Sequence, residues 1–96
     1  MKNLYDISKF VDVKTVEQTV CDLVNRFRKR RKEAGYTQKE LARRTNVSYA
    51  SIRRFETTGE ISFVSLVNLA SALDLLDDFY SLFKNPIVKD IRENEE

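Results

Sequence analysis

Residues 36–62 read YTQKELARRTNVSYASIRRFETTGEIS, and this stretch decides the fold. Thr37 and Glu40 have the form of a capping box, in which side chains satisfy free amides at the start of a helix. We therefore expect a helix of about two turns over residues 38–45. Asn46 follows, where we expect a sharp turn, because Asn tolerates positive φ better than any residue except Gly.

A second short helix follows this turn. Ser48 offers an N-cap for a helix over residues 49–57, in which Ile52 and Phe55 share the face that we expect to be buried. Two short helices joined by a tight turn, the second beginning with small polar residues and continuing with arginines, put one helix into the major groove of DNA. The stretch therefore predicts a DNA-reading helix that begins near Tyr49.

A longer helix precedes the stretch. Thr15 and Gln18 repeat the capping-box form at its start, and Gly35 ends it in the left-handed conformation that follows many helices. Its apolar residues recur at spacings that place them on one face: Val16, Val20, Leu23, Val24, Phe27 and Ala34. The sequence thus predicts one amphipathic helix before the two short ones.

Two further helices follow, after a loop at Thr58-Gly59-Glu60. Ser62 caps a helix whose apolar residues cover most of its circumference, as a central core helix requires: Val64, Leu66, Val67, Leu69, Ala70 and Leu73. Asp77 caps a short helix over residues 78–83, and Asn85-Pro86 ends it, because the residue before a proline is pushed out of the helical region. We therefore expect an all-α fold, an orthogonal bundle of five helices.

The five helices leave a segment at each end. We expect a DNA-binding domain over residues 15–84, a short N-terminal arm over residues 1–14 and a charged C-terminal tail over residues 85–96. The weak apolar alternation of residues 1–14 fits either a short strand or an ordered arm. A chain of 96 residues, 42% of them hydrophobic, leaves no room for a second domain.

Cysteine usage and hydropathy predict a cytoplasmic protein. The single Cys21 cannot form an internal disulfide, which fits a reducing compartment. Asp6 and Lys9 stand where a signal peptide would need a continuous apolar stretch. The longest uncharged stretch, residues 61–73, is too short and too polar to span a bilayer, so we expect no membrane association.

Positive charge is concentrated in one part of the chain. Residues 26–54 carry eleven Lys or Arg and two Glu, a net charge of +9, whereas the other 67 residues carry six basic and thirteen acidic side chains, a net −7. Such a concentrated basic region is the electrostatic footprint of a protein that binds a phosphate backbone. The alternative is a solvated helix face.

The quoted stretch closely resembles the helix-turn-helix of the Cro/repressor-type, XRE-like family. The resemblance covers roughly residues 20–83 and rests on Thr37-Gln38-x-Glu40-Leu41-Ala42, Val47-Ser48, Ile52 and Phe55-Glu56. It implies a lambda-repressor-like bundle and a sequence-specific transcriptional regulator that binds double-stranded DNA. The function that we expect is that of an autoregulatory repressor, a homodimer on a palindromic operator.

The resemblance also implies roles for individual residues. The positions that face base edges in the family are Tyr49, Ala50, Ser51, Arg53 and Arg54. Helix geometry cannot present all of these side chains to the groove at once, so we expect one arginine to bind phosphate instead. Gln38 would contact a phosphate and brace the DNA-reading helix, and Arg31 would pair with Glu56 as a structural bridge.

Further candidates for phosphate contacts surround the DNA-reading helix. Arg28 and Lys32, four residues apart, would form a phosphate-facing stripe on the preceding long helix. Ser48 at the start of the DNA-reading helix, and Thr57 and Thr58 at its end, carry hydroxyls that could reach the DNA backbone. For the two threonines the alternative is a solvated loop hydroxyl.

One departure from the family pattern points to a subgroup. After Glu56 the usual Asn-Gly turn is replaced by Thr57-Thr58-Gly59, one residue longer. With the continuation GEISFVSLVNLASALDLLDDFYSLF, residues 59–83, this variant resembles HipB-type antitoxins. That resemblance implies a HipA-like kinase toxin as a partner, and the alternative function of an antitoxin whose DNA binding serves autoregulation.

The sequence argues against an enzyme. The chain has no His, so that Cys21 lacks a candidate imidazole base, and it has no Gly-rich phosphate loop. Its acidic residues are not spaced as metal ligands. We therefore expect no catalytic activity and no cofactor or metal.

Overall fold

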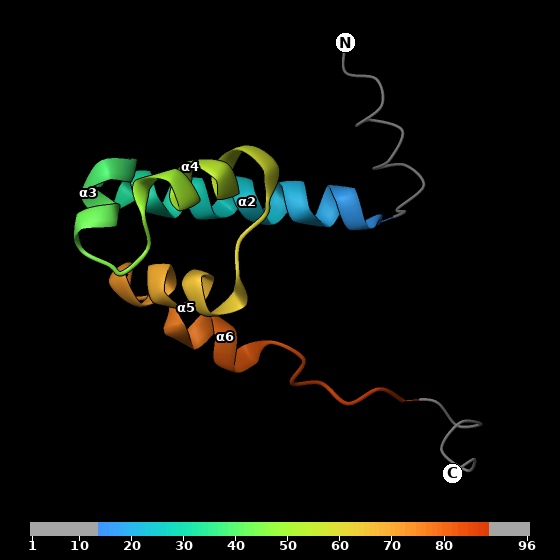
Figure 1. Cartoon of the computed structure of the whole chain (residues 1–96). Helices are drawn as coiled ribbons and strands as arrows, with labels where there is room; N and C mark the ends of the chain where they lie inside the picture. The colour runs from blue at the N-terminus through green and yellow to red at the C-terminus, as the bar shows by residue number, and fades with distance from the viewer. Residues whose placement is uncertain (1–13, 89–96) are drawn as a thin grey trace.

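The computed structural model describes residues 14–88, and this part of the chain forms five α-helices and no strand (Figure 1). The helices are α2 (Val16–Glu33), α3 (Gln38–Arg43), α4 (Tyr49–Thr58), α5 (Phe63–Ala72) and α6 (Leu76–Ser81). The all-α prediction is therefore confirmed. The expected N-terminal arm, except Lys14, and the tail after Val88 lie outside the described residues. No helix within residues 14–88 is long and apolar enough to cross a membrane.

Four of the helices begin at the N-caps that the sequence predicts. The side-chain oxygen of each cap accepts a hydrogen bond from the backbone N–H three residues later, at 3.0 or 3.1 Å. The caps are Thr15, Thr37, Ser48 and Ser62. Because first-turn amides have no partner within the helix, each such bond stabilises the fold by about 1 kcal/mol.

The hydrophobic core lies where α2, α3, α4 and α5 meet. Leu41, Ile52 and Leu69, which come from α3, α4 and α5, are completely buried. Phe27 of α2 packs edge-on against Phe55 of α4, with ring centroids 5.3 Å apart. In Figure 1, α3 and α4 lie beside the C-terminal half of α2, and α5 and α6 lie below them. The core therefore holds α4 by one face and leaves its other face exposed.

The turn between α3 and α4 differs from the sequence prediction. α3 ends at Arg43, and Asn46 does not take the positive φ that we expected. The hydroxyl of Thr45 closes the turn instead: it donates to the Leu41 carbonyl at 3.0 Å and accepts the N–H of Val47 at 3.2 Å. Side-chain hydrogen bonds of Thr45 thus stabilise the turn, in place of the positive φ that we expected at Asn46.

The last helix begins earlier than the sequence predicts, and Asp77 is not its cap. The N-cap position is Leu75, which makes no side-chain cap hydrogen bond. Asp74 takes a φ of 62°, and the Leu75 N–H donates to the Ala70 carbonyl at 2.8 Å, so the backbone itself turns the chain from α5 into α6. Asp77 and Asp78 lie in the first turn, where carboxylates meet the positive end of the helix dipole.

The apolar face of α2 is buried only in part. Val24 and Phe27 are buried, whereas the apolar residues nearer the start of the helix are exposed: Val16, Val20 and Leu23. The reason is visible in Figure 1, where the N-terminal half of α2 extends beyond α3 and α4.

α5 is not the fully surrounded helix that its sequence predicts. Leu69 and Ala70 are its only buried residues, and Phe63 and Val64 at its start are exposed. α5 thus packs on the core with one face. Leu66 and Ala72 pack against the core while only half-buried.

Candidate nucleic-acid interface

A buried ion pair joins α2 to α4. Arg31, 6% exposed, donates to both carboxylate oxygens of Glu56, 4% exposed, through two hydrogen bonds of 2.8 Å. The predicted bridge is therefore confirmed. Arg31 also donates to the Tyr36 carbonyl at 2.8 Å, and the side-chain amide of Gln38 donates to Glu56 at 2.9 Å. Arg31, Gln38 and Glu56, here called the Glu56 clamp, tie α2, α3 and α4 together through one carboxylate.

The surroundings of Glu56 keep its carboxylate charged. Burial raises the pKa of this side chain, because the charged form loses its hydration. Hydrogen bonds from Arg31 and Gln38, together with the positive charges of Arg31 and Arg28, outweigh burial, so the pKa of Glu56 lies below its ordinary value. Arg28 contributes from a distance of 3.5 Å between its Nε and the Glu56 Oε1. The Glu56 carboxylate is therefore ionised at neutral pH.

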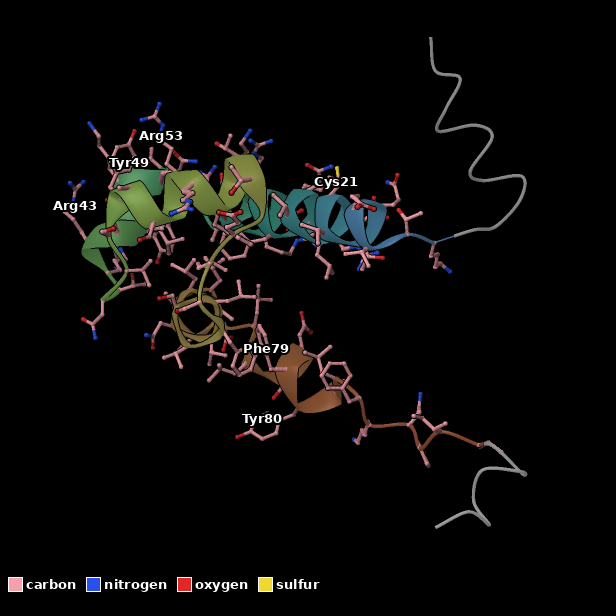
Figure 2. All side chains as sticks on the ribbon, turned by 45° about the vertical axis from the view of Figure 1, so that its right-hand side comes forward. Cys21, Arg43, Tyr49, Arg53, Phe79 and Tyr80 are labelled. Atoms are coloured by element: carbon pink, nitrogen blue, oxygen red, sulfur yellow. The ribbon has the colours of Figure 1, made fainter. Side chains whose placement is uncertain are left out.

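The face of α4 opposite the core is polar and exposed. The exposed residues on it are Tyr49, Ala50, Arg53 and Arg54, whereas Ser51 is half-buried. Tyr49 and Arg53 are four residues apart and so lie on the same side of the helix. Figure 2 shows both side chains pointing outward, on the opposite side of the molecule from Phe79 and Tyr80 of α6.

The two arginines of α4 have different surroundings. Arg54 pairs with Glu60 at 2.6 Å, beyond the end of the helix. Arg53 makes no ion pair with any residue in the range 14–88. Successive residues of a helix point about 100° apart, so these two side chains cannot enter the same groove in the same way. The structure thus separates two residues that the sequence pattern treats alike.

Two basic residues of α3 lie beside this face and were not among the predicted site residues. The Lys39 Nζ lies 5.3 Å from the centre of the Tyr49 ring, a cation–π geometry. Arg43 is four residues further along α3, and Figure 2 shows it pointing outward at the same end of the molecule as Tyr49. Their spacing, which puts them on one side of a two-turn helix, is the signal in the sequence that could have identified them.

The comparison with known families agrees with this geometry. The family described as Helix-turn-helix matches residues 27–78, more than half of the chain. The chain belongs to this helix-turn-helix family. Its members of the XRE type are DNA-binding transcription regulators, and α3 and α4 form the motif. No curated protein and no solved structure shows significant similarity to the chain.

The polar residues at the start of each motif helix are held in place by hydrogen bonds. The Ser48 hydroxyl accepts the Ser51 N–H at 3.1 Å and donates to the Ser51 hydroxyl at 3.0 Å. Gln38 is half-buried and braces α4 through Glu56, as predicted from the resemblance. Both side chains are thus fixed at the starts of their helices.

The threonines at the end of α4 direct their hydroxyls toward the helix. Thr57 and Thr58 donate to the carbonyls of Arg53 and Arg54, each at 2.8 Å. Thr58 also accepts the N–H of Glu60 at 3.1 Å. Both hydroxyl hydrogens are therefore occupied by backbone carbonyls in this structure.

The two predicted phosphate-facing residues of α2 differ in exposure. The Arg28 side chain is 43% exposed and lies against Glu56, whereas Lys32 is exposed one helical turn further along. Arg28 therefore has a structural partner as well as a solvent-facing side. Among residues 14–88 no group of three or more His, Cys, Asp or Glu is placed to hold a metal ion.

Proposed function

We propose that this chain is an autoregulatory repressor that binds a palindromic operator as a homodimer, with α4 in the major groove. The observation that carries the proposal is the exposed pair of Tyr49 and Arg53 on a helix whose other face is fixed by the core and the Glu56 clamp. Base reading needs side chains that reach base edges from a rigid support. The exposed side chains of α4 and its buried opposite face support this assignment.

Within the exposed face of α4, we assign base reading to Tyr49, Ala50 and Arg53. Arginine binds both acceptors of a guanine edge, the commonest specific contact, and a small side chain such as Ala50 fits against a thymine methyl group. Ser51 is a weaker candidate for base reading, because it is half-buried and its hydroxyl accepts a hydrogen bond from Ser48. We assign Arg54 to a phosphate, which would replace Glu60 as its partner.

We assign the remaining phosphate contacts to side chains that surround α4. They are Gln38, Ser48, Arg28 and Lys32. Lys39 of α3 is added because it lies over the Tyr49 ring, and Arg43 because it is exposed four residues further along the same helix. Thr57 and Thr58 would join them only by turning their hydroxyls away from the helix carbonyls. Each phosphate that a Lys or Arg neutralises releases counterions, so affinity for DNA falls as the salt concentration rises.

A selection of bound sites from random double-stranded DNA, at a stated salt concentration, tests the proposal. The expected result is a palindrome whose half-sites have centres about one helical turn apart. A reporter driven by the chain's own promoter should then be repressed, and scrambling one half-site should relieve the repression. A selected pool without any enriched sequence would contradict base reading.

A second candidate function is that of an antitoxin that neutralises a HipA-like kinase toxin. The observation that favours it is the start of the C-terminal tail, where Ile87 is 78% and Val88 80% exposed. Apolar side chains in a charged tail are candidates for burial on a protein partner. Deleting the chain after Asn85 should leave operator affinity unchanged and abolish inhibition of the kinase. An equal loss of operator affinity and of kinase inhibition would contradict the assignment of DNA binding and toxin binding to different parts of the chain.

A further inference from the structure

An ion pair between Arg54 and Glu60 closes a ring of contacts at the end of α4. The Arg54 guanidinium donates to the Glu60 carboxylate at 2.6 Å. The Glu60 N–H donates to the Thr58 hydroxyl at 3.1 Å, and this hydroxyl donates to the Arg54 carbonyl at 2.8 Å. The contacts of Thr58 therefore hold the backbone of Glu60 against the last turn of the DNA-reading helix.

The turn after α4 brings the two charged side chains together. On a continuous helix, residues six apart point about 120° away from each other and lie about 9 Å apart along the axis, so they do not meet. Gly59 ends α4 with a φ of 85°, and its N–H donates to the Phe55 carbonyl at 2.8 Å. The chain turns at this point, and the turn returns Glu60 to the side of Arg54.

Both members of the pair face solvent. The side chain of Arg54 is 66% exposed and that of Glu60 is 65% exposed. Exposed ion pairs are weak, because water and salt screen their charges. One hydrogen bond joins this pair, whereas a phosphate can accept two parallel N–H groups of an arginine. A DNA phosphate is therefore a strong enough acceptor to take Arg54 from Glu60.

Glu60 differs from the other carboxylates that form ion pairs in the described part of the chain. Glu56 also pairs with Arg28, which we assign to a phosphate, but Glu56 is buried in the clamp. Glu33 is exposed, but its partner Arg30 is not among the residues that we assign to DNA. Glu60 is thus the exposed carboxylate that occupies a side chain assigned to the DNA backbone.

We propose that Glu60 is a positioning residue that competes with DNA phosphate for Arg54 and so sets the protein concentration at which the chain binds DNA. This inference rests on the proposed function, in which Arg54 binds a phosphate. Carboxylate and phosphate oxygens accept the same guanidinium N–H groups, so opening the pair weakens every DNA complex, whatever its base sequence. In a repressor of its own gene, Glu60 therefore raises the protein level at which the promoter is half occupied.

Glu60→Gln tests the competition, because it keeps the size of the side chain and removes its charge. Fluorescence anisotropy measures binding to a random-sequence duplex and to the duplex that the wild type selects from random DNA. At low salt, affinity should rise about two- to fivefold on both duplexes, the range that an exposed ion pair contributes. The gain should shrink as salt is added, because salt screens the pair. Unchanged or weaker binding would overturn the inference.

Glu33→Gln is the matched control for net charge. It removes the same charge from an exposed carboxylate that also pairs with an arginine, Arg30, at 2.8 Å. Its gain in affinity should be smaller than that of Glu60→Gln, because it frees no side chain that we assign to DNA. An equal gain would attribute the effect to net charge and would rule out a specific role for Glu60.

A double-mutant cycle separates competition for Arg54 from direct repulsion of the DNA. If Glu60 acts through Arg54, adding Glu60→Gln to Arg54→Ala should leave the affinity of Arg54→Ala unchanged. An equal gain in both backgrounds would mean that Glu60 repels phosphate directly, which contradicts the proposal. Circular dichroism should show the same helix content for all variants, because both side chains are exposed.

Other outcomes separate this inference from the proposed function. A wild type that selects an operator, with no gain from Glu60→Gln, would overturn the role of Glu60 alone. Tighter binding of Glu60→Gln to a random pool from which no sequence is enriched would support the competition and overturn base reading. With the reporter driven by the chain's own promoter, Glu60→Gln should repress at a lower protein concentration than the wild type. Repression at the same or a higher concentration would overturn its role in setting that level.

Discussion

Arg31 of α2 and Glu56 of α4 are 25 residues apart in the chain, yet they form two hydrogen bonds of 2.8 Å in a buried setting. Two buried charges of opposite sign lose hydration that their attraction must offset, and they stabilise a fold only when their remaining hydrogen-bonding groups are satisfied. Gln38 and Tyr36 satisfy them here. The pair therefore fixes the orientation of the exposed face of α4 relative to α2.

Arg31→Met should lower the free energy of unfolding by about 3 kcal/mol, because it leaves the Glu56 carboxylate buried without its main partner. Urea denaturation followed by circular dichroism measures the loss. Adding Glu56→Leu should recover much of it, since no buried charge then remains. A double variant less stable than Arg31→Met would show that the carboxylate is not the source of the loss.

The lowered pKa of Glu56 predicts a loss of stability in acid. A carboxyl group whose pKa is lower in the folded state contributes stability above its unfolded pKa of about 4.3, and this contribution disappears as the pH falls through the folded value. The wild type should therefore lose free energy of unfolding below about pH 4.3. Glu56→Gln should be less stable at pH 7 and should show a shallower acid loss. Identical acid slopes for the two proteins would contradict the assignment.

Sequence patterns predicted most of the fold because residues that are close in the chain determine where four of the helices start. A cap such as Ser62 needs only the amides of the next turn, so three residues suffice to identify it. Burial of α5 was overestimated because apolar content shows that a face is suited to burial and not that a neighbour covers it, as Val64 shows. The start of α6 was missed because Asp74 turns the chain through a backbone conformation that no side-chain pattern marks.

Gly59 allows α4 to end close to α2, and its replacement should be costly. Its φ is 85°, and an added Cβ would overlap with Cγ1 of Val20. Gly59→Ala should cost about 2–4 kcal/mol, from left-handed strain and overpacking together. Gly35→Ala is the control: its φ is 84°, but nothing lies within 4 Å of the added Cβ, so strain of about 1–2 kcal/mol should remain alone. Adding Val20→Ala to Gly59→Ala should restore part of the lost stability. If Gly59→Ala lowered the free energy of unfolding only as much as Gly35→Ala does, the overlap with Val20 would contribute nothing to the loss.

The candidate site was predictable as a segment and less so as individual contacts. The family resemblance pointed to Tyr49 and Arg53 as candidates, and the helix period places these two residues, four apart, on one side of α4. The pairing of Arg54 with Glu60 depends on the path of the chain after Gly59, which the sequence does not specify. Lys39 was missed because its neighbour Tyr49 lies on another helix, ten residues further on.

Arg53 and Arg54 should respond differently to replacement. Arg53→Ala should weaken binding to the selected operator by about 1–3 kcal/mol and relax the preference at one base pair. Arg54→Ala and Arg28→Ala should weaken operator and random duplexes alike, because phosphate contacts carry no sequence information. Gel shifts on both duplexes measure the difference. Equal losses on the two duplexes for all three variants would show that the base reader lies elsewhere.

Lys39 should act on DNA binding through charge and through Tyr49. Lys39→Met keeps the aliphatic stem and removes the ammonium that lies 5.3 Å from the Tyr49 ring, so the slope of log affinity against log salt should become shallower by about 1. If the ammonium also orients Tyr49, preference at one base pair should weaken as well. Lys14→Met is the control, because Lys14 is also a lysine but lies before the start of α2, outside residues 26–54. An unchanged salt slope for Lys39→Met, or an equal change for Lys14→Met, would place the DNA backbone away from α3.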